Sequence, residues 1–171
     1  MRLKLVKLRD LSGNMASVYG VWCADLQKTS FDNFLDKNKN LFKSELKSII
    51  SRLKIIGNET GARETYFKIN EGVPGDGVCA LYDSPDKRLR LYCIRYGTLI
   101  VIVGGGGPKN VRKLQQNPKL KDENYFLREF SAQITERLKE GDLWYSEDYM
   151  NFEGNLEFDY EPSMIKDHKK R

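Results

Sequence analysis

The stretch LIVIVGGGGPK, residues 99–109, decides much of the fold. Its first five residues are all apolar, whereas a strand with one face in water alternates apolar and polar residues. The run therefore predicts a central strand of a sheet, covered on both faces or nearly so. Four consecutive glycines follow it, and then Pro108 and Lys109.

The glycines do not match a nucleotide-binding loop. A loop of the Walker type needs a Lys-Ser/Thr pair before a helix, and a dinucleotide fingerprint needs glycines that open a helix, which Pro108 disfavours at this register. Two interpretations remain open. Either the glycines end the strand and let a substrate or another backbone approach beside Lys109, or they supply a flexible bend. We expect this segment to edge a cleft.

Other segments on both sides of this stretch also have the composition of strands. Alternating apolar residues predict strands in MRLKLVKLR (1–9), SVYGVWCADL (17–26), ETYFKIN (64–70), VCALYD (78–83) and RLRLYCIRYG (88–97). The first two are expected to form a hairpin. Short connections between the others favour an antiparallel meander that ends in the apolar run.

Helical patterns flank the meander. They predict a short helix capped by Ser30, a longer helix over residues 41–56, and a third over residues 121–141 with Asp122 as its cap and Gly141 at its end. The apolar face of the third helix holds Phe126, Phe130, Ile134 and Leu138. The predicted fold class is α+β: a small antiparallel sheet of four to six strands, with the two earlier helices and the C-terminal helix packed on one face.

The charges along the chain restrict the possible partners. Residues 1–118 hold 20 Lys and Arg against 11 Asp and Glu, whereas residues 142–161 hold seven acidic residues and no basic one. The excess of Lys and Arg over residues 1–118, the basic body of the chain, favours binding of a polyanion, although a solvated surface without a partner has the same composition. We divide the chain into a domain over residues 1–141 and an acidic, aromatic tail over residues 142–171. The tail either covers the basic body and suppresses its activity, or completes the core.

Other signals exclude whole classes of function. The three cysteines are scattered without a CxxC pair, and the single histidine, His168, lies in the last residues of the chain. We therefore expect no metal site and no cofactor. The N-terminal segment carries charges where a secretory signal has its apolar centre, and no run approaches the roughly 18 apolar residues of a membrane span. We expect a cytoplasmic protein.

Strand parity places basic and aromatic side chains on one face. In the strand before the apolar run, Arg88, Arg90 and Tyr92 point away from the apolar side. In residues 64–70 the same rule places Tyr66 and Lys68 away from it. If helices cover the apolar face, the other face offers cations for RNA phosphates and phenol rings for stacking on bases. The alternative is ordinary cross-strand pairing on an exposed face.

The order of these elements, over about residues 30–140, resembles the RelE/HigB group of bacterial toxins. In that family a strand with a Y-R-h-h-Y pattern precedes an apolar strand that ends in a His-Gly-Phe-x-Lys-Lys segment. LRLYC (89–93) is similar to the first and puts Arg90 at the family's arginine. VIVGGGGPK (101–109) resembles the second and puts Lys109 at its last lysine.

The chain departs from the family pattern within the second segment. Gly104 and Gly106 stand where the family has a histidine and a phenylalanine, and Pro108 replaces one lysine. These positions belong to the family's catalytic set. A non-catalytic module of the same fold, which binds RNA or a protein partner, therefore stays an alternative to an enzyme.

The resemblance implies an endoribonuclease of a type II toxin-antitoxin system. Members cut mRNA on the ribosome by attack of a 2'-hydroxyl on the adjacent phosphate. For this chain the resemblance implies charge stabilisation by Arg90 and Lys109 and proton transfer by Tyr92. The residues expected to bind RNA are Arg88, Tyr66, Lys68 and Arg112. The expected partners are RNA, the ribosome and an antitoxin protein.

Overall fold

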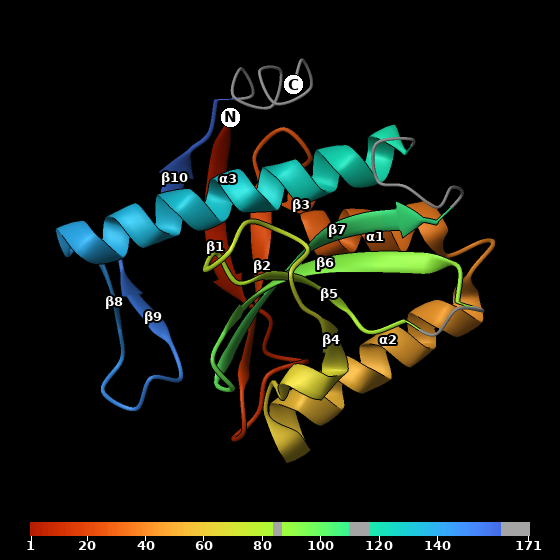
Figure 1. Ribbon diagram of the computed structural model, residues 1–171, viewed down its shortest axis with the longest axis horizontal. Helices are drawn as coiled ribbons and strands as arrows, with labels where there is room; N and C mark the ends of the chain where they lie inside the picture. Colours follow the sequence, from red (N-terminus) through yellow and green to blue (C-terminus); the bar gives the residue numbers. More distant parts are fainter. Residues whose placement is uncertain (84–86, 110–116, 162–171) are drawn as a thin grey trace.

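One eight-stranded sheet lies at the centre of the computed structural model, which describes residues 1–83, 87–109 and 117–161 (Figure 1). The elements follow in the order β1 (Arg2–Lys7), β2 (Ser17–Cys23), β3 (Lys28–Thr29), α1 (Ser30–Asn38), α2 (Lys43–Ile55), a π-helical turn η1 (Ile56–Thr60), a 3₁₀ turn η2 (Glu64–Tyr66), β4 (Phe67–Lys68), β5 (Val78–Leu81), β6 (Leu89–Tyr96), β7 (Ile100–Pro108), α3 (Pro118–Glu140), β8 (Leu143–Tyr145), β9 (Phe152–Gly154) and β10 (Glu157–Asp159).

The sheet has the strand order β10-β1-β2-β7-β6-β5-β4, and β3 pairs with the end of β2. The β1-β2 hairpin and the antiparallel β4 to β7 meander confirm two predictions. β2 and β7 pair in parallel, so the sheet is mixed. The predicted number of four to six strands is wrong, because the described sheet also contains the short β3 and, from the C-terminal segment, β10.

β7 is a central strand covered on both faces, as its apolar run predicts. Val101 and Val103 pack in one hydrophobic cluster with side chains of α1 and α2, while Ile100 and Ile102 pack in a second cluster with side chains of α3. All four are fully buried. The prediction that every helix packs on one face is therefore wrong. A strand that is apolar at each position gives both faces an apolar surface, and each surface needs its own helical cover.

The helices begin at caps other than the predicted ones. The Thr29 hydroxyl accepts a hydrogen bond from the Asp32 backbone N–H at 3.0 Å, so Thr29 rather than Ser30 caps α1. The Asn117 side chain caps α3 by accepting from the Leu120 N–H at 3.2 Å, one turn before the predicted Asp122.

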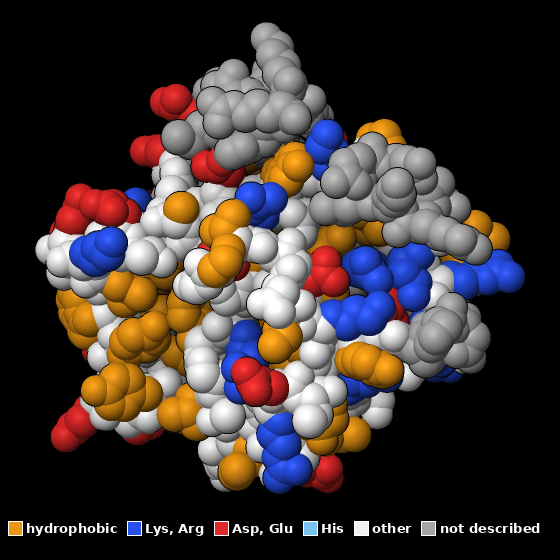
Figure 2. Space-filling view, viewed as in Figure 1, with side chains coloured by type: hydrophobic (Ala, Val, Ile, Leu, Met, Phe, Trp, Pro, Cys, Tyr) orange, Lys and Arg blue, Asp and Glu red, His pale blue; other side chains and the backbone are white. Residues whose placement is uncertain are grey.

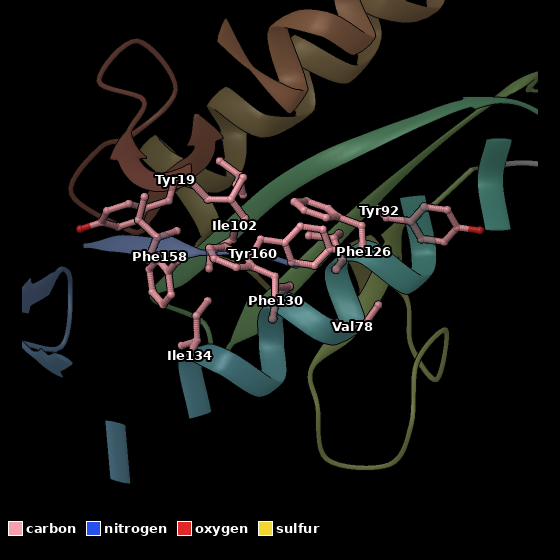
Figure 3. Close-up of a cluster of buried hydrophobic side chains, with 14 of the residues drawn as sticks. Tyr19, Val78, Tyr92, Ile102, Phe126, Phe130, Ile134, Phe158 and Tyr160 are labelled. Atoms are coloured by element: carbon pink, nitrogen blue, oxygen red, sulfur yellow. The ribbon is translucent and has the colours of Figure 1, made fainter. Parts of the chain in front are cut away.

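The apolar face of α3 packs as predicted. Phe126, Phe130 and Ile134 lie in the core against the sheet (Figure 3), and Leu138 packs at the margin of the same cluster. Gly141 ends the helix in the left-handed conformation, with φ of 81°. The C-terminal boundary of this helix was therefore readable from the sequence.

The four glycines lie inside β7, so the prediction that they end the strand or edge a cleft is wrong. A Cβ atom on Gly104 would lie 2.7 Å from the Leu127 side chain of α3, and one on Gly106 would collide with the backbone carbonyl of Arg90 on β6. Both glycines are buried. Their missing side chains allow a helix and a neighbouring strand to approach β7 closely.

The C-terminal segment completes the core. β8 and β9 form a separate two-stranded hairpin, and β10 pairs with β1 at the sheet edge opposite β4. The Phe158 ring packs edge-on against Phe130 at a centroid distance of 4.9 Å, and the Tyr160 ring packs against Phe126 at 5.0 Å. This packing favours the core-completing interpretation of the tail up to residue 161; residues 162–171 lie outside the described part.

Candidate anion-binding site

Three basic side chains converge on one buried carboxylate, that of Asp83. The Lys68 ammonium lies 2.9 Å from Asp83 Oδ1, and the Lys109 ammonium lies 2.8 Å from Oδ2. The Arg90 Nε atom lies 3.7 Å from the same Oδ2. We call these four residues the Asp83 cluster. All three cations were expected to take part in the site, two as catalytic residues and Lys68 as an RNA-binding residue.

Strand pairing brings the cluster together from distant parts of the chain. Lys68 of β4 pairs with Ala80 of β5, and Asp83 follows Ala80 by three residues, just beyond the end of that strand. Arg90 of β6 pairs with Gly107 of β7. The Lys109 backbone N–H donates to the Arg88 carbonyl at 2.7 Å, which holds the end of β7 against β6. The cations are thus fixed by backbone pairing and by their ion pairs with Asp83.

The Asp83 carboxyl is ionised in this environment. Burial acts to raise its pKa, but the ammonium groups of Lys109 and Lys68 and the guanidinium of Arg90 outweigh burial, so the pKa of Asp83 is lowered from its ordinary value. Three cations around one anion leave two positive charges in excess. The cluster is therefore suited to attract a further anion.

The cations reach solvent, whereas the carboxylate is covered. The Asp83 side chain is 6% exposed, while those of Lys68, Arg90 and Lys109 are 36%, 20% and 17% exposed. Figure 2 shows basic side chains gathered over the ends of β6 and β7, with acidic side chains among them. The exposed Arg88 precedes β6 beside this surface. An anion can thus reach the basic groups directly.

A narrow groove between α2 and strands β5 and β6 adjoins the cluster. Its lining includes Asp83 and Lys87 on the strand side and Glu45 and Arg52 on α2. The Glu45 carboxylate accepts from the Arg88 backbone N–H at 2.6 Å, and Arg52 donates to the Tyr82 carbonyl. These contacts fix the segments on both sides of Asp83 against α2.

Tyr92 lies on the expected side of β6 but in the core. Its side chain is fully buried among α3-facing residues, and its hydroxyl points away from the other labelled side chains (Figure 3). Burial raises the pKa of Tyr92 to about 12, although the nearby Arg90 guanidinium acts to lower it. The expectation of an open basic and aromatic sheet face is wrong, because α3 covers that face.

The other predicted RNA-binding residues do not all join the cluster. Tyr66 is partly buried against the α1-α2 side of the sheet with Phe67, because residues 64–66 form a 3₁₀ turn in which strand alternation does not apply. Arg112 lies outside the described residues.

Asp83 was missed as a site residue. The available signal was an acid at the end of a predicted strand, shortly before Lys87, Arg88 and Arg90.

The described residues give two further findings. They contain no group of three or more His, Cys, Asp or Glu side chains placed to hold a metal ion. Over residues 1–83, 87–109 and 117–161, no helix has the length and apolar character that a membrane crossing requires.

The fold and the site together define an α+β protein with a basic cluster at one end of its sheet. Comparisons with protein-family models, curated proteins and solved structures find no match to the chain.

Proposed function

We propose that this protein is a toxin-like endoribonuclease that acts on mRNA and binds a phosphate group of its substrate at the Asp83 cluster. The observation that carries the proposal is the convergence of Lys68, Arg90 and Lys109 at one point, with two positive charges in excess. The resemblance to RelE/HigB toxins implies Arg90 and Lys109 as site residues, and strand alternation over residues 64–70 adds Lys68.

The chemistry of this reaction suits such a cluster. When a 2'-hydroxyl attacks the adjacent phosphate, negative charge builds up on the phosphate oxygens and on the departing 5'-oxygen. Arg90 and Lys109 are the groups we assign to these oxygens, and Lys68 and Arg88 bind neighbouring phosphates. Tyr92 takes no part in this assignment, since its hydroxyl is buried and holds its proton at neutral pH.

Growth arrest on induced expression tests the proposal. Arrest by the wild-type chain and its relief by Arg90→Ala or Lys109→Ala are the expected results. Lys28→Ala is the matched control, because Lys28 also forms a 2.8 Å ion pair, with Asp36, but lies beside α1 and outside the cluster. An arrest that both cluster variants leave unchanged would count against the proposed function.

The ribosome and an antitoxin are the partners that this proposal includes. Ribosomes programmed with a defined message are expected to support cleavage that naked message does not undergo. A small antitoxin-like product encoded beside this chain is expected to abolish the arrest when the two are expressed together.

A second candidate function is RNA binding without cleavage. Gly104 and Gly106, which stand at catalytic positions of the family, are enclosed between β6 and α3, and among the described residues no catalytic side chain takes their place there. A module of this kind would bind a defined message with an affinity that Lys109→Ala reduces, yet leave the message intact in the presence of ribosomes. Specific cleavage by purified protein would dispose of this candidate.

A further inference from the structure

We infer that the three cations of the Asp83 cluster form a receptor for one phosphate group, and that the Asp83 carboxylate occupies this receptor in the free protein as an internal competitor. The inference rests on the proposed function only in naming RNA as the natural source of the phosphate. The receptor itself can be tested with inorganic phosphate.

The geometry around Asp83 is that of a bound oxyanion. Two ammonium groups approach different oxygens of one carboxylate at 2.9 and 2.8 Å, and a guanidinium nitrogen approaches the second oxygen at 3.7 Å. Phosphate and carboxylate are recognised by the same basic groups, through charge-assisted contacts at similar distances. Lys68 lies on β4, Arg90 lies on β6, and Lys109 directly follows β7, where its backbone N–H donates to the Arg88 carbonyl. The position at which the three cations meet is therefore fixed before a ligand arrives.

The cluster also holds polar atoms that its present contacts leave without a hydrogen bond. Within the described part of the chain, Arg90 Nε and both Asp83 carboxylate oxygens are buried, and their ion pairs do not meet hydrogen-bond geometry. A phosphate has more acceptor oxygens than a carboxylate, and it can accept a hydrogen bond from the Arg90 Nε–H that Asp83 leaves unpaired.

An internal carboxylate at this position weakens phosphate binding. A bound phosphate must either displace Asp83 or lie beside it, and at 4 Å the repulsion of two unit charges in water costs about 1 kcal/mol. The exposure of the three cations provides the approach, while Asp83 sits beneath them with 6% of its side chain exposed. Asp83 therefore sets how much phosphate or RNA is needed to fill the site.

The test compares Asp83→Asn with the wild-type chain. Asn keeps the shape of the side chain and removes its charge, so affinity for inorganic phosphate, measured by calorimetry at constant ionic strength, is expected to rise about fivefold. Affinity for a short single-stranded RNA is expected to rise by a similar factor. Asp36→Asn is the matched control: Asp36 also lies between two lysines, Lys28 and Lys39, but on the exposed surface of α1. It should leave both affinities unchanged.

The outcomes separate this inference from the proposed function. Tighter phosphate binding with unchanged RNA binding supports the receptor and overturns RNA as its ligand. Phosphate binding that is unchanged or weaker in folded Asp83→Asn overturns the inference, whatever the wild-type chain does to mRNA. If Asp83→Asn does not fold, the comparison is repeated in a chain that has one cation fewer. The single variant Lys68→Met is then compared with the double variant that carries Lys68→Met and Asp83→Asn. Equal phosphate affinity in that pair also overturns the inference.

Discussion

Arg90 and Tyr92 lie on the same side of β6, two residues apart, but only the first of the two reaches the surface. Tyr92 is fully buried beneath α3, whereas the Arg90 side chain is 20% exposed and joins the Asp83 cluster. The strand passes from the covered part of the sheet to its open end between these two positions. A single strand thus supplies both a core residue and a site residue through the same face.

Tyr92→Phe is expected to leave both stability and function nearly unchanged. The Tyr92 hydroxyl is buried without a hydrogen-bond partner among the described residues, so removing it relieves a desolvation cost and leaves no new cavity. Denaturation in urea should give a free energy of unfolding within about 1 kcal/mol of wild type. If instead this hydroxyl transfers a proton in catalysis, Tyr92→Phe will abolish growth arrest as fully as Arg90→Ala does.

The contribution of Asp83 to stability is expected to depend on pH. Its pKa is lowered in the folded protein from the ordinary value of 3.8, so its ion pairs stabilise the fold above that value, and this stabilisation is lost as the pH falls through the folded pKa. Urea denaturation of the wild-type chain and Asp83→Asn should therefore differ most at neutral pH. The difference should shrink below pH 3.8. A constant difference down to the folded pKa would contradict this assignment.

The stability cost of a Gly→Ala substitution in the glycine run is expected to depend on which atoms lie next to each glycine. Gly104→Ala forces the Leu127 side chain to move and should cost about 1–3 kcal/mol. Gly106→Ala should cost more, because its Cβ would meet backbone rather than a flexible side chain. Gly107→Ala is the control within the same strand, since its Cβ would lie 3.4 Å from Lys119, an ordinary contact. Thermal melts that rank Gly107→Ala as the most damaging of the three would refute this packing.

The C-terminal strand is expected to be necessary for folding. Phe158 is 2% exposed, packs against Phe130 and lies under the Arg137 guanidinium, so Phe158→Ala should cost about 3–5 kcal/mol. Leu41→Ala removes a side chain that is 85% exposed and should change stability by less than about 0.5 kcal/mol. Deletion of residues 142–171 should yield no folded truncate. A stable, cooperative truncate would show that β10 is dispensable.

Local patterns predicted several elements well. The uninterrupted apolar run identified β7 as a central strand, and helical spacing placed Phe126, Phe130 and Ile134 of α3 inward. Gly141 marked the end of that helix because a left-handed residue is needed there. These features follow from burial and backbone conformation, which nearby residues express on their own.

Other features depend on residues that are distant in sequence. The glycines of β7 mark close approach by α3 and β6, but the sequence does not state which partners approach, so their interpretation as a cleft edge failed. The alternation rule placed Tyr92 on the correct side of β6, yet it carried no information on what covers that side. Sequence analysis predicted the cations of the site and missed Asp83, because no local rule links an acid after β5 to a lysine on β4 and a lysine just after β7.

By itself the sequence determined the longer strands and the three helices, which of their side chains are apolar, and that Arg90 and Lys109 stand near the ends of neighbouring strands. The tertiary structure decided that helices cover both faces of the sheet, that β10 closes its edge, and that Lys68, Arg90 and Lys109 share one carboxylate. The physical reason is sequence distance. Backbone conformation and apolar periodicity depend on neighbouring residues, whereas burial of a sheet face and pairing of charges require partners from other parts of the chain.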